Sequence, residues 1–443
     1  MRPLRFVLCL GVMCGWSSSV RAAESAPLRL AVSDNDRYLV RADGRPFFYL
    51  GDTAWELFHR LSREDADVYL ADRARKGFTV IQAVVLAEFG GLTEPNPYGH
   101  LPLRDRDPAQ PVDEYFQHVD YIVERAASLG MCVGMLPTWG DKVNKKWGQG
   151  PEIFTPKNAR VFGEYLGRRY KDRPIIWILG GDRPIEKEEH RQIFNAMAEG
   201  LAKGDGGAHL MTYHPSGGHS SSEYVHDAAW LDFNMLQSGH AQKNKASYEM
   251  IARDLARKPP KPTLDGEPCY EDHPVRKNKD EGWFDEWDVR KLCYWGLFAG
   301  AHGHTYGAHP VWQMWDGVSP KLTDPRRSWK EALALPGAAQ AGYARRLMQS
   351  RPFLSRIPDH SLLVGPNGEG ANYRAATRDQ HGGYAMIYSA SGRPFTIDLK
   401  KLPAKTLRAW WFDPRRGEAQ AAGVGENEGP REFRPPTSGA GQD

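Results

Sequence analysis

Short apolar runs alternate with amphipathic segments along most of the chain. Runs rich in β-branched and aromatic residues predict eight strands, at 47–51, 78–85, 131–136, 175–179, 209–214, 233–237, 262–267 and 304–307. Between them, apolar residues recur at the spacing of one helix face. One such face consists of Tyr115, Val119, Ile122 and Ala126. Gly130 follows this face and is typical of a helix end.

The order of these elements predicts the fold class. Ser62 opens a capping box, and Thr155 with Pro156 marks another helix start. Eight strands with crossover helices over roughly 300 residues fit a (β/α)8 TIM barrel better than an open sheet. We place this α/β barrel at 28–350. No GxGxxG or GxxxxGK[ST] motif follows an early strand, so the sequence gives no support for a nucleotide-binding fold.

After Pro352 the pattern changes to short strands separated by turns. Strands are predicted at 372–377, 383–389, 395–399 and 407–412, which indicates a small antiparallel β-sandwich over 352–443. From Ala421 onward the chain is rich in Gly, Pro and Glu, and we expect it to be loose.

Two segments at the edges of these domains leave alternatives open. The stretch 431–436 resembles the approach to a last strand. We expect either a sandwich that lacks this strand or a sequence that stops short of it. The segment 34–40 precedes the barrel, and its strand is expected to join the sandwich or the barrel floor.

The N-terminus has the pattern of an export signal. Arg2 and Arg5 precede an apolar run at 6–16, and small residues at 20–22 offer a cleavage site after Ala22. We therefore expect a signal peptide at 1–22 and a periplasmic or secreted protein. No later stretch approaches 18 apolar residues, so no membrane span is expected after signal removal.

Composition narrows the class of partner. Three of the 58 basic residues lie within 1–22, where there is no acidic residue, and 55 basic and 55 acidic residues remain. This balance argues against nucleic acid or an anionic membrane as the main partner. The 14 Trp, 18 Tyr and 17 Phe favour a carbohydrate partner, although a large core also uses such residues. Nothing in the sequence indicates an oligomeric state.

The three cysteines after residue 22 are too few for a disulfide scaffold. Cys132, Cys269 and Cys293 are odd in number, and we expect free, packed thiols, with a Cys269–Cys293 bridge as the alternative. The pair His302 and His304 resembles a chelating motif, but no third ligand follows a known metal pattern, so no metal is expected. We expect no other cofactor.

Active sites of such barrels lie at the carboxyl ends of the strands. Asp182 follows the strand 175–179 and two glycines, and Glu267 ends the strand 262–267. An unpaired carboxylate at a buried strand end is costly without a purpose, although each could instead cap the following segment. Two carboxyl groups facing each other are the usual requirement for glycoside hydrolysis, so we interpret this pair as catalytic. Asp265 is interpreted as a supporting ion-pair residue.

Other polar and aromatic residues also fall at or just after strand ends, and we expect them to bind substrate. Structural alternatives remain open, capping for Asp52 and core packing for each tryptophan. The candidates are Asp52, Trp55, Gln82, Glu88, Trp139, Tyr213, His214, Gln237, His240, His304 and Tyr306.

Four of these motifs, in the same order, resemble the apiosidase-like glycoside hydrolases, glycoside hydrolase family 140. They are 51–55 (GDTAW), 178–182 (ILGGD), 266–268 (GEP) and 304–307 (HTYG). The stretch 411–417 (WFDPRRG) is similar to the small β domain beside that barrel, which is named for collagen binding. The resemblance implies catalysis by Asp182 and Glu267 and release of apiose from rhamnogalacturonan II, a pectic polysaccharide of plant cell walls.

The resemblance leaves the exact function open. Gly181-Asp182 replaces the Asn-Glu that commoner barrel glycosidases carry after strand four. Another specificity, such as that of an arabinofuranosidase, and a non-catalytic sugar-binding or adhesion protein are the alternatives. A long Glu267 and an Asp182 on an overhanging loop should approach to the roughly 5–5.5 Å of retaining enzymes. We therefore expect Glu267 to be the nucleophile and Asp182 the acid/base.

Overall fold

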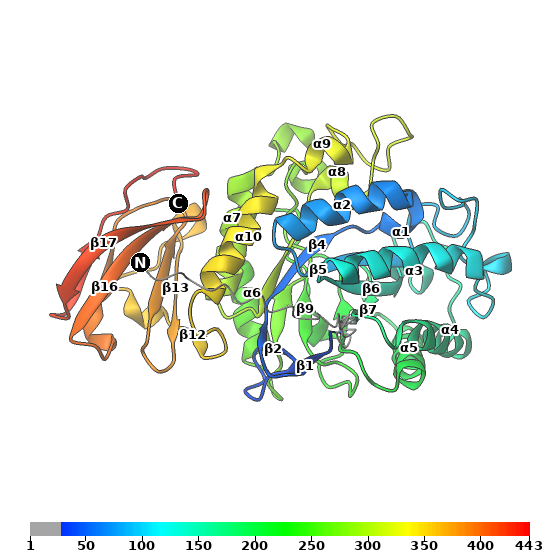
Figure 1. Cartoon of the computed structure of the whole chain (residues 1–443), viewed down its shortest axis with the longest axis horizontal. Helices are drawn as coiled ribbons and strands as arrows, with labels where there is room; N and C mark the ends of the chain where they lie inside the picture. The colour runs from blue at the N-terminus through cyan, green and yellow to red at the C-terminus, as the bar shows by residue number, and fades with distance from the viewer. Residues whose placement is uncertain (1–27) are drawn as a thin grey trace, which may run out of the picture.

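The computed structural model describes residues 28–443, so the expected signal peptide lies outside the described residues. A barrel is followed by a β domain (Figure 1). The barrel strands are β4 (Tyr49–Thr53), β5 (Val80–Leu86), β6 (Cys132–Thr138), β7 (Ile175–Gly180), β8 (Met211–His214), β9 (Asn234–Leu236), β10 (Thr263–Asp265) and β11 (Gly303–Tyr306).

These eight strands form the predicted TIM barrel. Six lie in a parallel sheet of order β11-β4-β5-β6-β7-β8, and β9 pairs with β10 in parallel. Close contacts of β8 with β9 and of β10 with β11 complete the ring. The predicted α/β fold class is therefore confirmed, with shorter strands at β9 and β10 than the apolar runs suggested.

The helices alternate with these strands and cover the outside of the barrel. They are α1 (Leu57–Arg60), α2 (Arg63–Arg75), α3 (Asp113–Ser128), α4 (Pro156–Tyr170), α5 (Glu188–Asp205), α6 (Ser247–Leu255), α7 (Glu286–Phe298), α8 (His309–Trp312), α9 (Trp329–Ala332) and α10 (Pro336–Gln349). The predicted helix start at Thr155 is present, and the one at Ser62 is present without the reciprocal half of a capping box. The Ser62 side chain accepts a hydrogen bond from the Asp65 backbone, and Thr155 forms a capping box with Asn158. No helix within residues 28–443 is long and apolar enough to cross a membrane.

Glycines allow α4 and α5 to pack at unusually short range. A Cβ atom at Gly200 would lie 2.2 Å from the Arg160 carbonyl oxygen, and one at Gly163 would lie 2.5 Å from the Met197 carbonyl oxygen. Any larger side chain would push the two helices apart.

The segment before the barrel forms the floor, one of the two predicted alternatives. Strands β1 (Leu30–Val32), β2 (Leu39–Arg41) and β3 (Pro46–Phe47) make an antiparallel sheet. Leu39 and Phe47 join the same buried cluster as the inward-facing barrel residues Tyr49, Val80 and Ile176. Apolar side chains therefore close the lower end of the barrel and leave the opposite end for the site.

The β domain consists of antiparallel strands, as predicted. They are β12 (Arg356–Pro358), β13 (Arg374–Asp379), β14 (Ala385–Ser389), β15 (Phe395–Asp398), β16 (Thr406–Asp413), β17 (Glu418–Glu426) and β18 (Pro430–Phe433).

The expectation of a loose end after Ala421 is wrong. Strand β17 pairs with β16, and β18 pairs with β15, so the stretch 431–436 contributes to a strand itself. The strand β17 has no apolar alternation because nearly all of its residues are exposed. Backbone pairing, which leaves no hydrophobic period, holds it in place.

Side chains fasten the β domain to the barrel. The Asp443 carboxylate pairs with Arg290 of α7 and accepts a hydrogen bond of 2.7 Å from the Tyr388 hydroxyl. The Tyr388 ring stacks on Tyr294 of α7 with centroids 4.6 Å apart. The cysteines Cys132, Cys269 and Cys293 are free and buried, as expected.

Candidate active site

Glu267 lies at the carboxyl end of β10 between two histidines. Its Oε1 is 3.0 Å from His240 Nε2, and its Oε2 is 3.0 Å from His214 Nε2. The contact between Glu267 Oε2 and His214 Nε2 is as short as a hydrogen bond, but its angles are outside the range of one. Burial alone would raise the pKa of Glu267, but hydrogen bonds and electrostatic interactions with His214 and His240 outweigh it and lower this pKa. The side chain is therefore held as a carboxylate.

His214 connects the two candidate catalytic residues. The Asp182 backbone N–H donates to His214 Nδ1 over 3.3 Å. Because Nδ1 accepts this bond, the proton of a neutral ring is assigned to Nε2, which faces Glu267. The ring lies 5.4 Å from Trp55 and 5.7 Å from Trp139, measured between centroids. The two tryptophans thus fix the plane of the histidine that touches Glu267.

Asp182 stands on a backbone turn just beyond β7. Its φ is +50°, after values of +87° at Gly180 and +124° at Gly181. A Cβ at Gly181 would lie 2.8 Å from the Gly140 nitrogen and 2.9 Å from the Trp139 ring, so only glycine fits there. This turn carries the Asp182 side chain over the barrel mouth, where 26% of it reaches solvent.

The pKa of Asp182 shifts in the opposite direction to that of Glu267. Burial raises it first, and the negative charge of Glu267 raises it further. Arg183 and His214 oppose these effects only in part. The pair therefore combines a carboxyl group whose pKa is raised with one whose pKa is lowered, which suits an acid and a nucleophile.

Arg183 links Asp182 to a second carboxyl group. Its NH1 lies 3.0 Å from Asp182 Oδ2, and its NH2 lies 2.6 Å from Glu88 Oε1. The Arg183 side chain is only 1% exposed, so it contacts both carboxyl groups from the buried side of the site. Burial raises the pKa of Glu88 to about 7, although Arg183 opposes this shift. Trp147 donates its indole N–H to Asp182 Oδ2 over 3.3 Å.

Three further residues support the loops that carry the site. Gln82 donates to the Gly266 carbonyl over 3.0 Å and so fixes the backbone next to Glu267. Trp55 donates to the Tyr270 hydroxyl over 3.0 Å, and the Tyr270 ring lies 4.3 Å from that of His240. These contacts orient one of the two histidines that hold Glu267.

Asp265 ties the β9 and β10 loops together through backbone hydrogen bonds, but the expected ion pair is wrong, because within residues 28–443 no cationic side chain lies within 4.0 Å of its carboxylate. Its Oδ1 accepts from the backbone N–H of Ser238 over 3.2 Å and from that of Glu267 over 3.3 Å. Burial raises its pKa to about 6. Strand β10 ends at Asp265, so Glu267 lies two residues beyond the strand and not within it as the predicted range 262–267 implied.

Four candidates lie on the outward side of their strands and are not brought to this cluster. Arg73 Nε of α2 donates to Asp52 Oδ2 over 2.7 Å. Tyr306 of β11 lies opposite Asp52 in the register of β11 with β4. His304 shares that side of β11 with Tyr306, and burial lowers its pKa to about 3. The Tyr213 hydroxyl donates to the Arg183 carbonyl over 2.9 Å, so Tyr213 supports the loop from behind.

The structure brings together seven candidates and adds three residues that the sequence did not indicate. The seven are Asp182, Glu267, His214, His240, Trp55, Trp139 and Glu88. Gln82 and Gln237 lie nearby, Gln82 beneath the loop of Glu267 and Gln237 against the loop of Gly217. The additions are Arg183, Tyr270 and the 58% exposed Trp147. The only sequence signal was that Arg183 follows Asp182 directly.

A parallel barrel with two carboxyl groups of opposite pKa shift at its mouth is the arrangement of a glycoside hydrolase. Comparison with known families agrees. Residues 33–355 match the family described as "Apiosidase-like, catalytic domain", and the chain belongs to this family. Residues 357–443 match the domain described as "Putative collagen-binding domain of a collagenase". The resemblance seen in the sequence is confirmed.

Solved structures are similar over almost the whole chain. One described as "Glycoside hydrolase" is 34% identical, with a TM-score of 0.86 over 94% of this chain and 95% of its own. A family 5 glycoside hydrolase from Bacteroides vulgatus ATCC 8482 is 33% identical, with a TM-score of 0.86 over 94% and 91%. A comparison with curated proteins finds no match. The protein is an enzyme that hydrolyses glycosidic bonds and acts on a glycan.

Proposed function

We propose that this glycoside hydrolase is exported and releases apiose from side chains of pectic rhamnogalacturonan II by a retaining mechanism. The observation that carries the proposal is the pair at the barrel mouth. Glu267 is kept ionised by His214 and His240, while burial and the charge of Glu267 raise the pKa of Asp182. Such a division of roles between two carboxyl groups is what glycosidic cleavage needs.

The chemistry follows from the opposite directions of these two pKa shifts. A Glu267 oxygen forms a bond to the anomeric carbon while the bond from that carbon to the leaving oxygen breaks. Asp182 gives its proton to this leaving oxygen. Asp182, now a carboxylate, takes a proton from a water molecule, whose oxygen displaces Glu267 from the sugar. Both side chains end the cycle as they began it.

Charge near the mouth supports a glycan that carries carboxylates. Arg276 donates its backbone N–H to the His240 carbonyl over 2.9 Å, and its side chain is 58% exposed. Lys277 follows it. Burial is the main cause of the lowered pKa of His273 and His309 beside His240, and the charge of Lys277 adds to it. Glu281 lies 3.7 Å from Arg276 Nε and offsets part of its charge, so Lys277 contributes most to a preference for an acidic pectic chain over a neutral one.

Sugar release is the direct test. The purified chain is incubated with rhamnogalacturonan II oligosaccharides, and free monosaccharides are separated and identified. We expect apiose, and no release from arabinofuranosyl or mannosyl substrates offered at equal concentration. Release of arabinose instead would support the alternative specificity, and no release from any glycan would favour a binding or adhesion role.

A further inference from the structure

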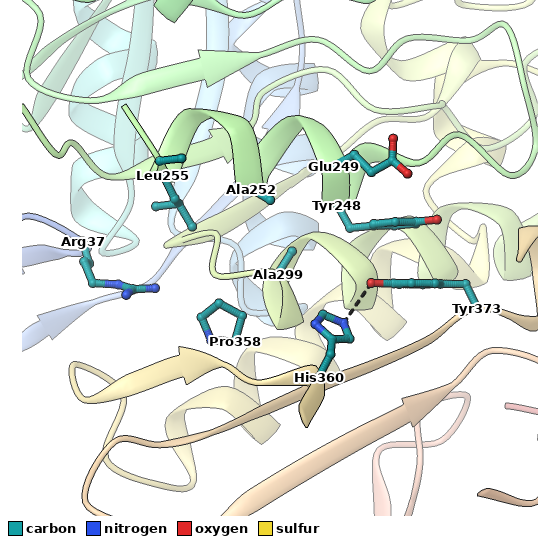
Figure 2. A pocket seen from close by; sticks show the side chains of 10 residues that line it. Arg37, Tyr248, Glu249, Ala252, Leu255, Ala299, Pro358, His360 and Tyr373 are labelled. Atoms are coloured by element: carbon teal, nitrogen blue, oxygen red, sulfur yellow. Dashed lines mark hydrogen bonds between the residues drawn. The ribbon is translucent and has the colours of Figure 1, made fainter. Parts of the chain in front are cut away.

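A second concave site lies where the barrel meets the β domain (Figure 2). It has a volume of about 600 Å³. One wall is α6, and the other comes from Pro358 and His360 of the β domain. Ala299 from the end of α7 and Arg37 from the turn before β2 complete it. Neither Asp182 nor Glu267 lines this groove, so it is separate from the catalytic centre.

Arg37 places an uncompensated cation at one end of the groove. Its Nε is buried and has no hydrogen-bond partner, and within residues 28–443 no carboxylate oxygen lies within 4.0 Å of its guanidinium. A buried donor without a partner costs free energy, which an incoming acceptor would recover. An arginine in this state suits a carboxylate, which can accept two parallel hydrogen bonds.

The opposite end of the groove carries groups that bind hydroxyls. Tyr248 and Tyr373 stack with centroids 3.7 Å apart and planes 4° apart, and the Tyr373 hydroxyl lies 2.8 Å from His360 Nε2. Glu249 is exposed beside this stack (Figure 2). Between the two ends, the surface is aliphatic and comes from Leu255 and small side chains. A cation, an aliphatic surface and hydroxyl acceptors thus follow one another along the groove.

We propose that this groove binds a uronic acid residue of the glycan, away from the bond that is cleaved. The sugar carboxylate would meet Arg37, its hydroxyls would donate to Glu249 and contact His360, and its C–H face would lie on the aliphatic surface. The proposal rests on the action of the enzyme on a glycan. It goes further because it gives the junction between the domains a role in holding the polymer.

Binding is measured by calorimetry on the full chain carrying Glu267→Gln, so that turnover does not interfere. The probes are trigalacturonic acid and the same trisaccharide with its carboxyl groups reduced to alcohols. Adding Arg37→Gln should weaken binding of the acid by about tenfold or more and leave the reduced sugar unchanged. Glu249→Gln should weaken both probes by about threefold, and it keeps the test valid if the Arg37 variant does not fold.

The matched control is Arg253→Gln, which removes the same charge from an exposed position on α6 outside the groove. It should leave both affinities unchanged. The proposal is overturned if Arg37→Gln binds the acid as tightly as its parent, or if Arg253→Gln weakens it equally. Displacement of the trisaccharide by an equal concentration of citrate would indicate a general anion site and would also overturn it. Sugar release by the wild-type chain tests the proposed function separately.

Discussion

Glu88 should control the pH range over which Asp182 keeps its proton. Replacing Glu88 with glutamine removes a negative charge but preserves the size of the side chain. Arg183 then acts on Asp182 without a second carboxylate to balance it. Since a positive neighbour favours the ionised form of a carboxyl group, we expect the pKa of Asp182 to fall in Glu88→Gln.

The size of this effect follows from the contacts of Arg183. The guanidinium lies 2.6 Å from Glu88 and 3.0 Å from Asp182, so the two carboxylates are at most about 8 Å apart. At an effective dielectric constant of about 20, two charges at that distance interact by about 2 kcal/mol, or about 1.5 pKa units. The side chains are 15% and 26% exposed, and solvent screening reduces the expected shift to about 0.5–1 unit.

The assay is the pH dependence of kcat/KM, whose basic limb reports the acid of the free enzyme. The pKa of Glu88 is raised to about 7, so its charge develops only as the pH passes that value. Wild type and Glu88→Gln should therefore agree below about pH 6, and the variant should lose activity first above pH 7. Glu186→Gln is the control, since Glu186 pairs with Lys146 and not with Arg183. Profiles of Glu88→Gln and wild type that coincide above pH 7 would refute this reasoning.

Four further predictions concern the catalytic pair and the barrel. Asp182→Asn should lower kcat by about 10²–10⁴-fold, and Glu267→Gln should abolish most turnover, both with unchanged thermal unfolding; normal turnover in either variant would remove it from the catalytic pair. Dialysis against a chelator should leave the rate unchanged, because the carboxyl pair performs the chemistry unaided; a loss that Ca²⁺ or Zn²⁺ restores would contradict this. NMR of the first sugar released should show the anomer of the substrate, and the opposite anomer would make Glu267 a base. Gly200→Val should lower the free energy of unfolding, measured by urea titration, by about 3 kcal/mol, because its Cβ would lie 2.2 Å from the Arg160 carbonyl oxygen. In the same titration Gly296→Ala in α7 should raise the free energy of unfolding by about 0.5–1 kcal/mol, because a Cβ at that position meets nothing within 4 Å.

The sequence predicted the barrel well because its strands are buried on both faces. Such strands appear as continuous apolar runs, and the helices between them keep a clear period. The sequence failed at β17, whose residues are almost all exposed and whose order comes from backbone pairing with β16. It also gave no sign that the Asp443 side chain would pair with Arg290, since that contact joins residues 153 positions apart.

The site was predicted only in part because strand ends identify positions but not directions. Tyr213 and His214 are neighbours at the end of β8, and alternation turns one outward to the Arg183 carbonyl and the other inward to Glu267. The direction of the Asp182 side chain depends on a turn with three successive positive φ values. The glycine pair in the sequence indicates that a turn is present but does not specify its geometry. Because this turn also donates to His214, it sets the tautomer that faces Glu267. The loop after β7 thus determines both the position of the acid and the hydrogen bonding of the nucleophile, so we expect changes in its glycines to disturb both catalytic groups together.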